Sequence, residues 1–151
     1  MKFLHKILVL GAFLLISSNC FGQVENLFKP TESQIAEYID EAYKGHANQL
    51  IYSKPNRLRD TQNLLIERIT IFRSSKKGIQ GTLISKMPLF NKFNGDLKRD
   101  LNIDPSNFNP LKYDLDFYSG YGHIYRMDGT DLYLKISPQT FTNASKSPKN
   151  E

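Results

Sequence analysis

The sequence predicts a single α+β domain in which one N-terminal amphipathic helix packs on an antiparallel sheet of four or five strands. Apolar residues recur at helical spacing between residues 31 and 45, whereas several shorter runs after residue 64 alternate apolar and polar residues. The dipeptide Asp128-Gly129 separates the last two runs and is favoured in tight hairpin loops. These three observations indicate one helix followed by a sheet that ends in a C-terminal β-hairpin.

The first 22 residues predict a cleaved secretory signal peptide. Two lysines precede an apolar run from Ile7 to Ile16, and small and polar residues follow it. The run is too short for a transmembrane helix, which needs about 20 residues, and no transmembrane helix is expected elsewhere. We therefore expect an exported protein that begins near Gln23 and works in the periplasm, on the outer surface or after secretion.

Cys20 leaves a second interpretation open, because a cysteine directly after an apolar run can carry the lipid anchor of a bacterial lipoprotein. Asn19 argues against lipidation, since smaller residues usually stand at that position. Otherwise Cys20 is removed with the signal, and the mature chain contains no cysteine. Disulfide bonds and thiolate metal sites are then excluded, and stability has to come from packing.

Length and charge indicate one domain of ordinary composition. Removing 22 of the 151 residues leaves 129, and we expect a single domain over residues 23–136 with a flexible C-terminal tail over 137–151. Removing Lys2 and Lys6 lowers Lys plus Arg from 20 to 18 against 15 acidic residues, so the net charge is +3. This small and dispersed surplus does not favour a nucleic-acid partner.

The helix is expected over residues 31–45. Thr31 can cap its free N–H groups while Gln34 reaches back, which is the capping-box pattern. Gly45 is the expected end. The apolar stripe consists of Ile35, Ile39 and Ala42, and residues 47–62 are expected to be mostly coil, because Lys54-Pro55-Asn56 interrupts the pattern.

Three strands are expected before the hairpin. Residues 64–73 are rich in Ile, Thr and Phe and favour a pleated surface, and Thr82 to Ser85 form a shorter partner. Residues 113–117 alternate most regularly, with Tyr, Leu and Phe on one face and two aspartates on the other. The segment from Leu89 to Pro110, between the second and third of these strands, is rich in turn residues and predicts a long loop. Functional residues often lie in such loops.

A two-residue loop at Asp128-Gly129 fixes an expected hairpin register. It pairs Tyr125 with Leu132 and His123 with Leu134, and it places Asp131 opposite Arg126 as a cross-strand ion pair. The expected buried face comprises Tyr121, His123, Tyr125, Leu132, Leu134 and Ile136.

His123 is the strongest candidate for acid/base catalysis, with Asp114 or Asp116 as the carboxylate that would orient it. A partly buried histidine at a sheet edge and solvated aspartates explain the same residues without catalysis. No nucleophile elbow, phosphate-binding loop, zinc-ligand pair or dinucleotide motif occurs in the sequence. We therefore expect no metal and no cofactor, and catalysis is the less favoured interpretation.

Aromatic and basic residues supply the candidates for binding. Phe90, Phe93, Phe108 and Tyr118 lie in or near the long loop and exceed what one sheet face needs, which predicts a contact patch. Lys54, Arg57 and Arg59, and separately Arg73, Lys76 and Lys77, form two basic clusters that would suit an anionic polymer, although charged turns at sheet edges explain them equally well.

In three segments, which are Pro88 to Asn94, Phe108 to Phe117 and Met127 to Asp131, the chain resembles small exported bacterial proteins of unknown function. The resemblance covers about the last half of the chain. It implies an envelope or secreted setting and offers no catalytic residues to carry over. The sequence thus predicts a non-enzymatic binding or interaction module, whose partner is an unknown envelope protein or polymer. The alternative is a small acid/base hydrolase that uses His123 with an aspartate.

Overall fold

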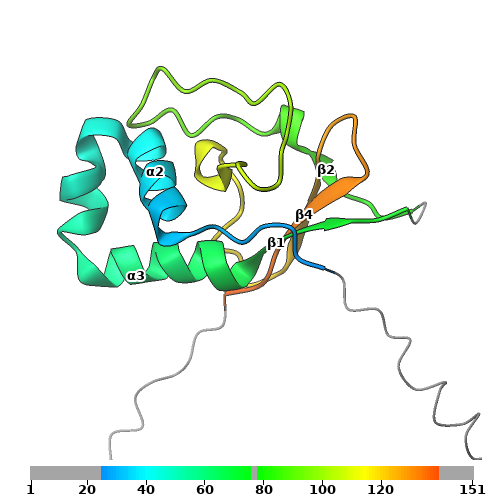
Figure 1. Cartoon of the computed structure of the whole chain (residues 1–151), viewed down its shortest axis with the longest axis horizontal. Helices are drawn as coiled ribbons and strands as arrows, with labels where there is room; N and C mark the ends of the chain where they lie inside the picture. The colour runs from blue at the N-terminus through cyan, green and yellow to red at the C-terminus, as the bar shows by residue number, and fades with distance from the viewer. Residues whose placement is uncertain (1–24, 76–77, 140–151) are drawn as a thin grey trace, which may run out of the picture.

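The computed structural model describes residues 25–75 and 78–139, which form a mixed α+β domain (Figure 1). Two helices lie at one end and a four-stranded sheet at the other, so the α+β class is as expected, whereas the second helix is not. The expected signal peptide and most of the expected C-terminal tail lie outside the described residues. Within the part of the chain that the structure describes, no helix has the length and apolarity needed to cross a membrane.

The expected N-terminal helix is present as α2, Glu32–Tyr43. The Thr31 hydroxyl accepts from the Gln34 N–H at 3.2 Å, and the Thr31 N–H donates to the Gln34 side chain at 3.0 Å, so the predicted capping box is confirmed. The helix ends at Tyr43, two residues before the expected end at Gly45, and its C-cap residue Lys44 has a φ of 47°, in the left-handed region. The expected apolar stripe of Ile35, Ile39 and Ala42 is buried.

A second helix occupies residues that we expected to be coil and the start of a strand. After the short 3-10 turn η1 (Lys44–His46) and the π-helical turn η2 (Asn48–Tyr52), α3 runs over Pro55–Asn63 and continues as the π-helical turn η3, Leu64–Arg68. Pro55 does not break the chain here, because the first helical position needs no N–H partner. We expected Leu64 and Leu65 to lie in a strand. Burial of their side chains instead stabilises the helical form of η3.

The sheet has the strand order β1-β4-β3-β2, and its strands are β1 (Ile69–Arg73), β2 (Thr82–Leu83), β3 (His123–Arg126) and β4 (Leu132–Ile136). β4 pairs antiparallel with both β1 and β3, whereas β2 pairs parallel with β3. The expectation of a purely antiparallel sheet is therefore wrong at β2. The long segment between β2 and β3 makes the parallel pair feasible, since such a pair needs a crossover of a dozen or more residues.

The C-terminal hairpin is present, with a register two residues away from the expected one. Tyr125 pairs with Leu134, and the Met127 N–H donates to the Leu132 carbonyl at 3.0 Å, which leaves a four-residue loop from Asp128 to Asp131. A shift of two residues keeps every side chain on its face, so Tyr125 and Leu134 are buried as expected. Tyr121 is the exception, because it precedes the strand and is 82% exposed.

The new register also changes an ion pair. Arg126 lies opposite Tyr133, so the expected pair between Arg126 and Asp131 does not form. Asp131 instead accepts two hydrogen bonds, at 2.7 and 2.8 Å, from Arg73 at the end of β1. The four-residue loop places Asp131 beside the neighbouring strand rather than across the hairpin.

Residues 113–117 do not form the expected strand. The only ladder contact there is an isolated bridge between Leu89 and Tyr113, directly after the 3-10 turn η5, Pro110–Lys112. The Leu115 and Phe117 N–H groups instead bond to the carbonyls two residues before them, at 2.9 and 2.8 Å. The alternation of burial was nevertheless predicted correctly for Tyr113 and Leu115, which are buried between exposed aspartates.

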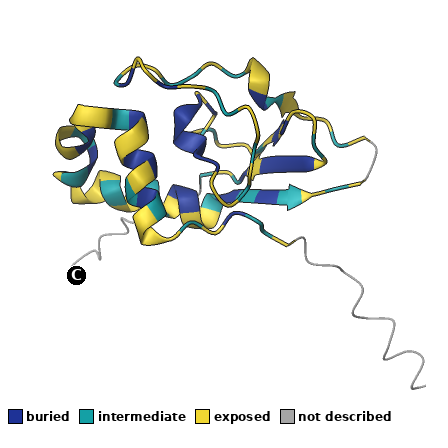
Figure 2. Cartoon of the chain, turned by 45° about the horizontal axis from the view of Figure 1, so that its top comes forward, coloured by how far each residue is buried: buried dark blue, intermediate teal, exposed yellow. Residues whose placement is uncertain are grey.

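The long loop between Leu89 and Pro110 is fastened to the helices rather than free. Asn94 donates to the Glu41 carbonyl at 2.7 Å, and Asn109 donates to the Tyr38 carbonyl at 3.1 Å. Figure 2 shows that η5, which ends this loop, is buried between the helices and the sheet. The loop therefore adds Phe108 to the core and also buries Leu97.

Candidate functional site

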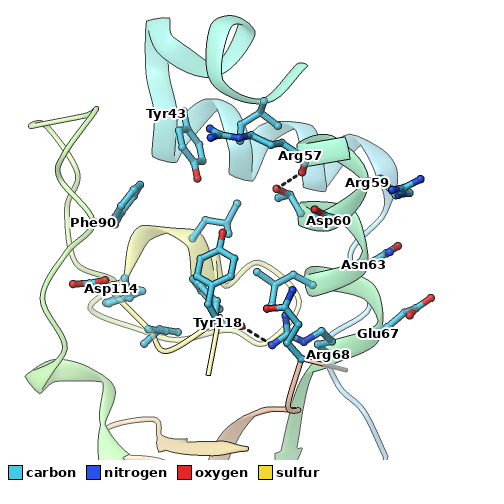
Figure 3. A pocket seen from close by; sticks show the side chains of 18 residues that line it. Tyr43, Arg57, Arg59, Asp60, Asn63, Glu67, Arg68, Phe90, Asp114 and Tyr118 are labelled. Atoms are coloured by element: carbon cyan, nitrogen blue, oxygen red, sulfur yellow. Dashed lines mark hydrogen bonds between the residues drawn. The ribbon is translucent and has the colours of Figure 1, made fainter. Parts of the chain in front are cut away.

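A cleft of about 790 Å³ lies between the α3–η3 helical stretch and the segment from Leu111 to Tyr118 (Figure 3). Tyr43 and Phe90 lie at one end of it. Its volume falls within the range of about 300–1,000 Å³ that is usual for small-molecule sites. We call this site the α3 cleft.

Helical spacing arranges the α3 wall. Arg57, Asp60, Leu64 and Arg68 recur every three or four residues and therefore lie on one side of the helical stretch. In Figure 3 the side chain of Arg57 extends toward Tyr43, and Asp60 lies below it on α3. Leu64 is buried and forms part of the apolar floor.

Arg68 fastens the opposite wall to the sheet. Its guanidinium donates to the Phe117 carbonyl at 2.5 Å and to the Ser137 carbonyl at 3.1 and 3.2 Å. Burial lowers the pKa of Arg68, and the nearby Tyr118 phenol opposes that shift. Because three of its N–H groups are engaged, Arg68 holds the backbone next to Tyr118 in place, and it has little capacity left for a ligand.

The opposite wall carries an exposed tyrosine and an exposed carboxylate. Tyr118 is 79% exposed at the mouth of the cleft, so its ring can be covered by a ligand without displacing another side chain. Asp114 is exposed, and its N–H donates to the Pro88 carbonyl at 2.9 Å, which fixes the backbone that presents it. Between them, Leu115 is buried in the floor.

Tyr43 supplies a neutral hydroxyl at the end of the cleft. Burial raises its pKa, the Tyr118 phenol raises it further, and the positive charge of Arg57 lowers it by a smaller amount. The net shift is upward from the ordinary value of 10.0. Tyr43 is therefore protonated at neutral pH and can both donate and accept a hydrogen bond.

Four charged groups of the cleft have unused hydrogen-bonding capacity. Among the described residues, the guanidinium of Arg57 and the carboxylates of Asp60, Glu67 and Asp114 form neither a hydrogen bond nor an ion pair. They offer one strong donor group and three strong acceptor groups to a ligand.

The four expected aromatic binding residues fall into different environments. Phe90 lines the cleft, whereas Phe93 packs behind it, with its ring 5.4 Å from that of Tyr43 and 5.7 Å from that of Phe90. Both phenylalanines are half-buried. Tyr118 is exposed at the cleft mouth.

Phe108 is a core residue. Only 2% of its surface is exposed, and its ring stacks on that of Tyr113 at 5.4 Å. The interpretation of Phe108 as a surface anchor is therefore wrong, because the loop that carries it turns its ring inward against the helices.

The expected catalytic residues are not brought together in a cavity. The Nδ1 atom of His123 lies 3.7 Å from a carboxylate oxygen of Asp116, and His123 Nε2 is buried without a hydrogen-bond partner. His123 does not line the α3 cleft, whereas Asp114 does. His123 and Asp116 therefore lie outside the cleft, whereas Asp114 lies in its wall.

The sequence patterns do not reveal the cleft, although they draw attention to its basic residues. Pro55 indicates a break in the chain and so favours a loop around Arg57 and Arg59, which hides the helical spacing that aligns Arg57 with Asp60. Within residues 25–75 and 78–139, no group of three or more His, Cys, Asp or Glu side chains is placed to hold a metal ion.

Comparison with known proteins adds no relative. No protein-family model, curated protein sequence or solved structure matches this chain.

Proposed function

We propose that this chain is a non-enzymatic binding module of an exported protein and that the α3 cleft is its binding site. The observation that carries the proposal is the combination of an exposed aromatic ring, Tyr118, with the unengaged polar groups of Arg57, Asp60 and Asp114 around one cavity. A cavity in which aromatic and polar side chains converge is a common form of binding site. Export is supported by the charged, apolar and small-residue segments of the first 22 residues.

Binding is favoured over acid/base hydrolysis by the position of His123. A catalytic histidine needs its carboxylate at about 2.6–3.2 Å and a ring nitrogen that reaches the substrate. The distance from His123 to Asp116 is 3.7 Å, and the other ring nitrogen is buried and unpaired. A histidine that packs at the start of strand β3 accounts for this geometry, with its ring stacked on Tyr125 at 6.4 Å.

The energy of such a module is expected to come from a few anchors, since most of the affinity of a binding site usually resides in a small number of residues. Tyr118 fits this role because it is exposed and because Arg68 fixes the adjacent Phe117 backbone. A pre-positioned ring loses less conformational entropy on binding than a mobile one.

Site-directed photocrosslinking in the exporting cells tests the proposal. The photoreactive residue p-benzoylphenylalanine replaces Tyr118 in one variant and Leu101 in the other. Leu101 is 95% exposed and does not line the cleft, so it reports random encounters. The proposal expects a defined adduct from position 118 and none from position 101.

Equal labelling at the two positions, or no adduct at either, would contradict a binding function for the cleft. An additional variant with His123→Ala separates the two functional classes. If that variant abolished a hydrolytic activity of the purified protein while its melting temperature stayed unchanged, the enzyme interpretation would replace this one.

A further inference from the structure

We infer that the α3 cleft binds a neutral oligosaccharide, an inference that rests on the proposed binding function and names the chemical class of its ligand. Sugar hydroxyl groups each donate and accept hydrogen bonds, and the C–H faces of a pyranose ring are apolar. A matching protein site therefore needs strong donors, strong acceptors and an aromatic surface within one cavity. The α3 cleft combines all three.

The polar groups match hydroxyl ligands in kind. The guanidinium of Arg57 supplies donors, the carboxylates of Asp60 and Asp114 supply acceptors, and none of the three has a partner among the described side chains. The neutral phenol of Tyr43 can act as a hydrogen-bond donor or as an acceptor. Planar guanidinium and carboxylate groups can each engage two neighbouring hydroxyls of one sugar ring.

The aromatic surface lies where it can stack on a sugar face. Tyr118 is 79% exposed at the cleft mouth, and Phe90 lies at one end beside Tyr43, with a ring separation of 5.8 Å. The negative faces of aromatic rings attract the weakly positive C–H groups of a pyranose. Tyr118 therefore provides the stacking surface, and the polar groups fix the orientation of the ring.

The charge of the cleft favours a neutral ligand over an anionic one. The cleft lining carries three acidic side chains, Asp60, Glu67 and Asp114, and three basic ones, Arg57, Arg59 and Arg68, of which Arg68 is engaged by backbone carbonyls. A polyanion would bring further negative charge next to these carboxylates, and this repulsion is not offset by a surplus of cations. A neutral saccharide avoids that penalty.

Binding of the purified mature chain to an array of defined oligosaccharides tests this inference. The array carries neutral cello-, malto-, xylo-, manno- and chito-oligosaccharides, together with anionic oligogalacturonate and heparin fragments. Isothermal titration calorimetry then gives the Kd of the best neutral probe for the wild type and for Tyr118→Ala, Tyr118→Phe and Tyr121→Ala. Tyr121 is the matched control, because it is 82% exposed, three residues away and outside the cleft lining.

We expect saturable binding of a neutral probe that Tyr118→Ala weakens by about tenfold or more, the loss usual for an aromatic anchor. Tyr118→Phe keeps the ring and should retain most of the affinity, whereas Tyr121→Ala should match the wild type. Equal losses for Tyr118→Ala and Tyr121→Ala would overturn the inference.

Two other outcomes also overturn it. One is the absence of binding to every neutral probe; the other is binding of the anionic probes alone, weakened by salt and by Arg57→Ala but not by Tyr118→Ala. If position 118 still gives its specific photocrosslink in either case, the binding function stands and only the ligand class is wrong. If that crosslink is also absent, the proposed function fails as well.

Discussion

The ammonium group of Lys112 lies 2.6 Å from a carboxylate oxygen of Asp100, and the lysine side chain is only 8% exposed. Glu41 of α2 approaches the same ammonium group at 3.3 Å, and the Tyr113 hydroxyl donates to the second oxygen of Asp100 at 2.8 Å. This cluster joins the long loop, η5 and α2. It therefore holds in place the start of the segment that forms one wall of the cleft.

Removing one partner of this buried pair should be costly. Asp100→Ala is expected to lower the free energy of unfolding by about 2 kcal/mol, somewhat less than the ~3–5 kcal/mol of a fully buried pair, because Glu41 still faces Lys112. Asp96→Ala is the control, since its pair with Lys44 is mostly exposed. Urea unfolding measures the free energy of unfolding of both variants. Equal losses would show that the buried Asp100 cluster stabilises the fold no more than the exposed pair of Asp96 with Lys44.

Gly129 should be sensitive to substitution because of its backbone. Its φ of 69° is a strained backbone conformation for residues other than glycine. A Cβ atom at this position would meet no other atom within 4 Å, so the backbone conformation and not steric crowding makes a substitution unfavourable. Gly129→Val is expected to cost about 1–2 kcal/mol. Gly95→Val, at an equally open position without positive φ, should change the melting temperature far less. Similar melting temperatures for the two variants would contradict this explanation.

Phe108→Ala should unfold or strongly destabilise the domain, with an expected cost of about 3–5 kcal/mol for a large buried ring. Tyr118→Ala should stay within about 0.5 kcal/mol of the wild type, because its ring is mostly exposed. Thermal and chemical denaturation of the two variants distinguishes packing residues from site residues. A stable Phe108→Ala variant would mean that the loop does not contribute to the core as described.

Stability should fall at alkaline pH. Burial is the largest cause that raises the pKa values of Tyr52 and Tyr113 to about 12. Hydrogen bonds to the carboxylates of Asp40 and Asp100 act in the same direction, whereas the hydrogen bond that Tyr113 accepts from the Asp100 N–H opposes the shift. The folded state therefore keeps protons that the unfolded chain releases near pH 10.0, so the stabilisation is complete below pH 10 and is lost as the pH rises toward 12.

Melting curves at a series of alkaline pH values measure this effect. Tyr52→Phe cannot ionise at that position, and its melting temperature should decline less steeply between pH 10 and 12 than that of the wild type. Tyr121→Phe, at an exposed position, serves as the control. An identical decline in all three proteins would exclude a contribution from Tyr52.

Export makes a separate prediction. Mass spectrometry of the envelope and medium fractions should find a mature chain that begins at Gln23, in part cyclised to pyroglutamate. A chain that begins at an acylated Cys20 would instead identify a lipoprotein.

Local sequence patterns sufficed wherever a structure depends on nearby residues. The capping box of Thr31 and Gln34, the apolar stripe of α2 and the alternating burial around Leu115 were predicted, because each follows from side chains a few positions apart. The hairpin was also predicted, and its register error of two residues left the side chains of the two strands on their expected faces, whereas Tyr121, which precedes β3, is exposed.

The tertiary structure decided what depends on distant partners. Burial of Leu64 and Leu65 keeps η3 helical although their neighbours favour a strand, and the Arg68 bonds to the Phe117 and Ser137 carbonyls replace the strand expected after η5. The α3 cleft exists only because this helical stretch meets a segment some fifty residues away, as the separation of 49 between Arg68 and Phe117 illustrates. The sequence by itself determined the composition, the helix cap and the hairpin, whereas packing between distant segments determined the site.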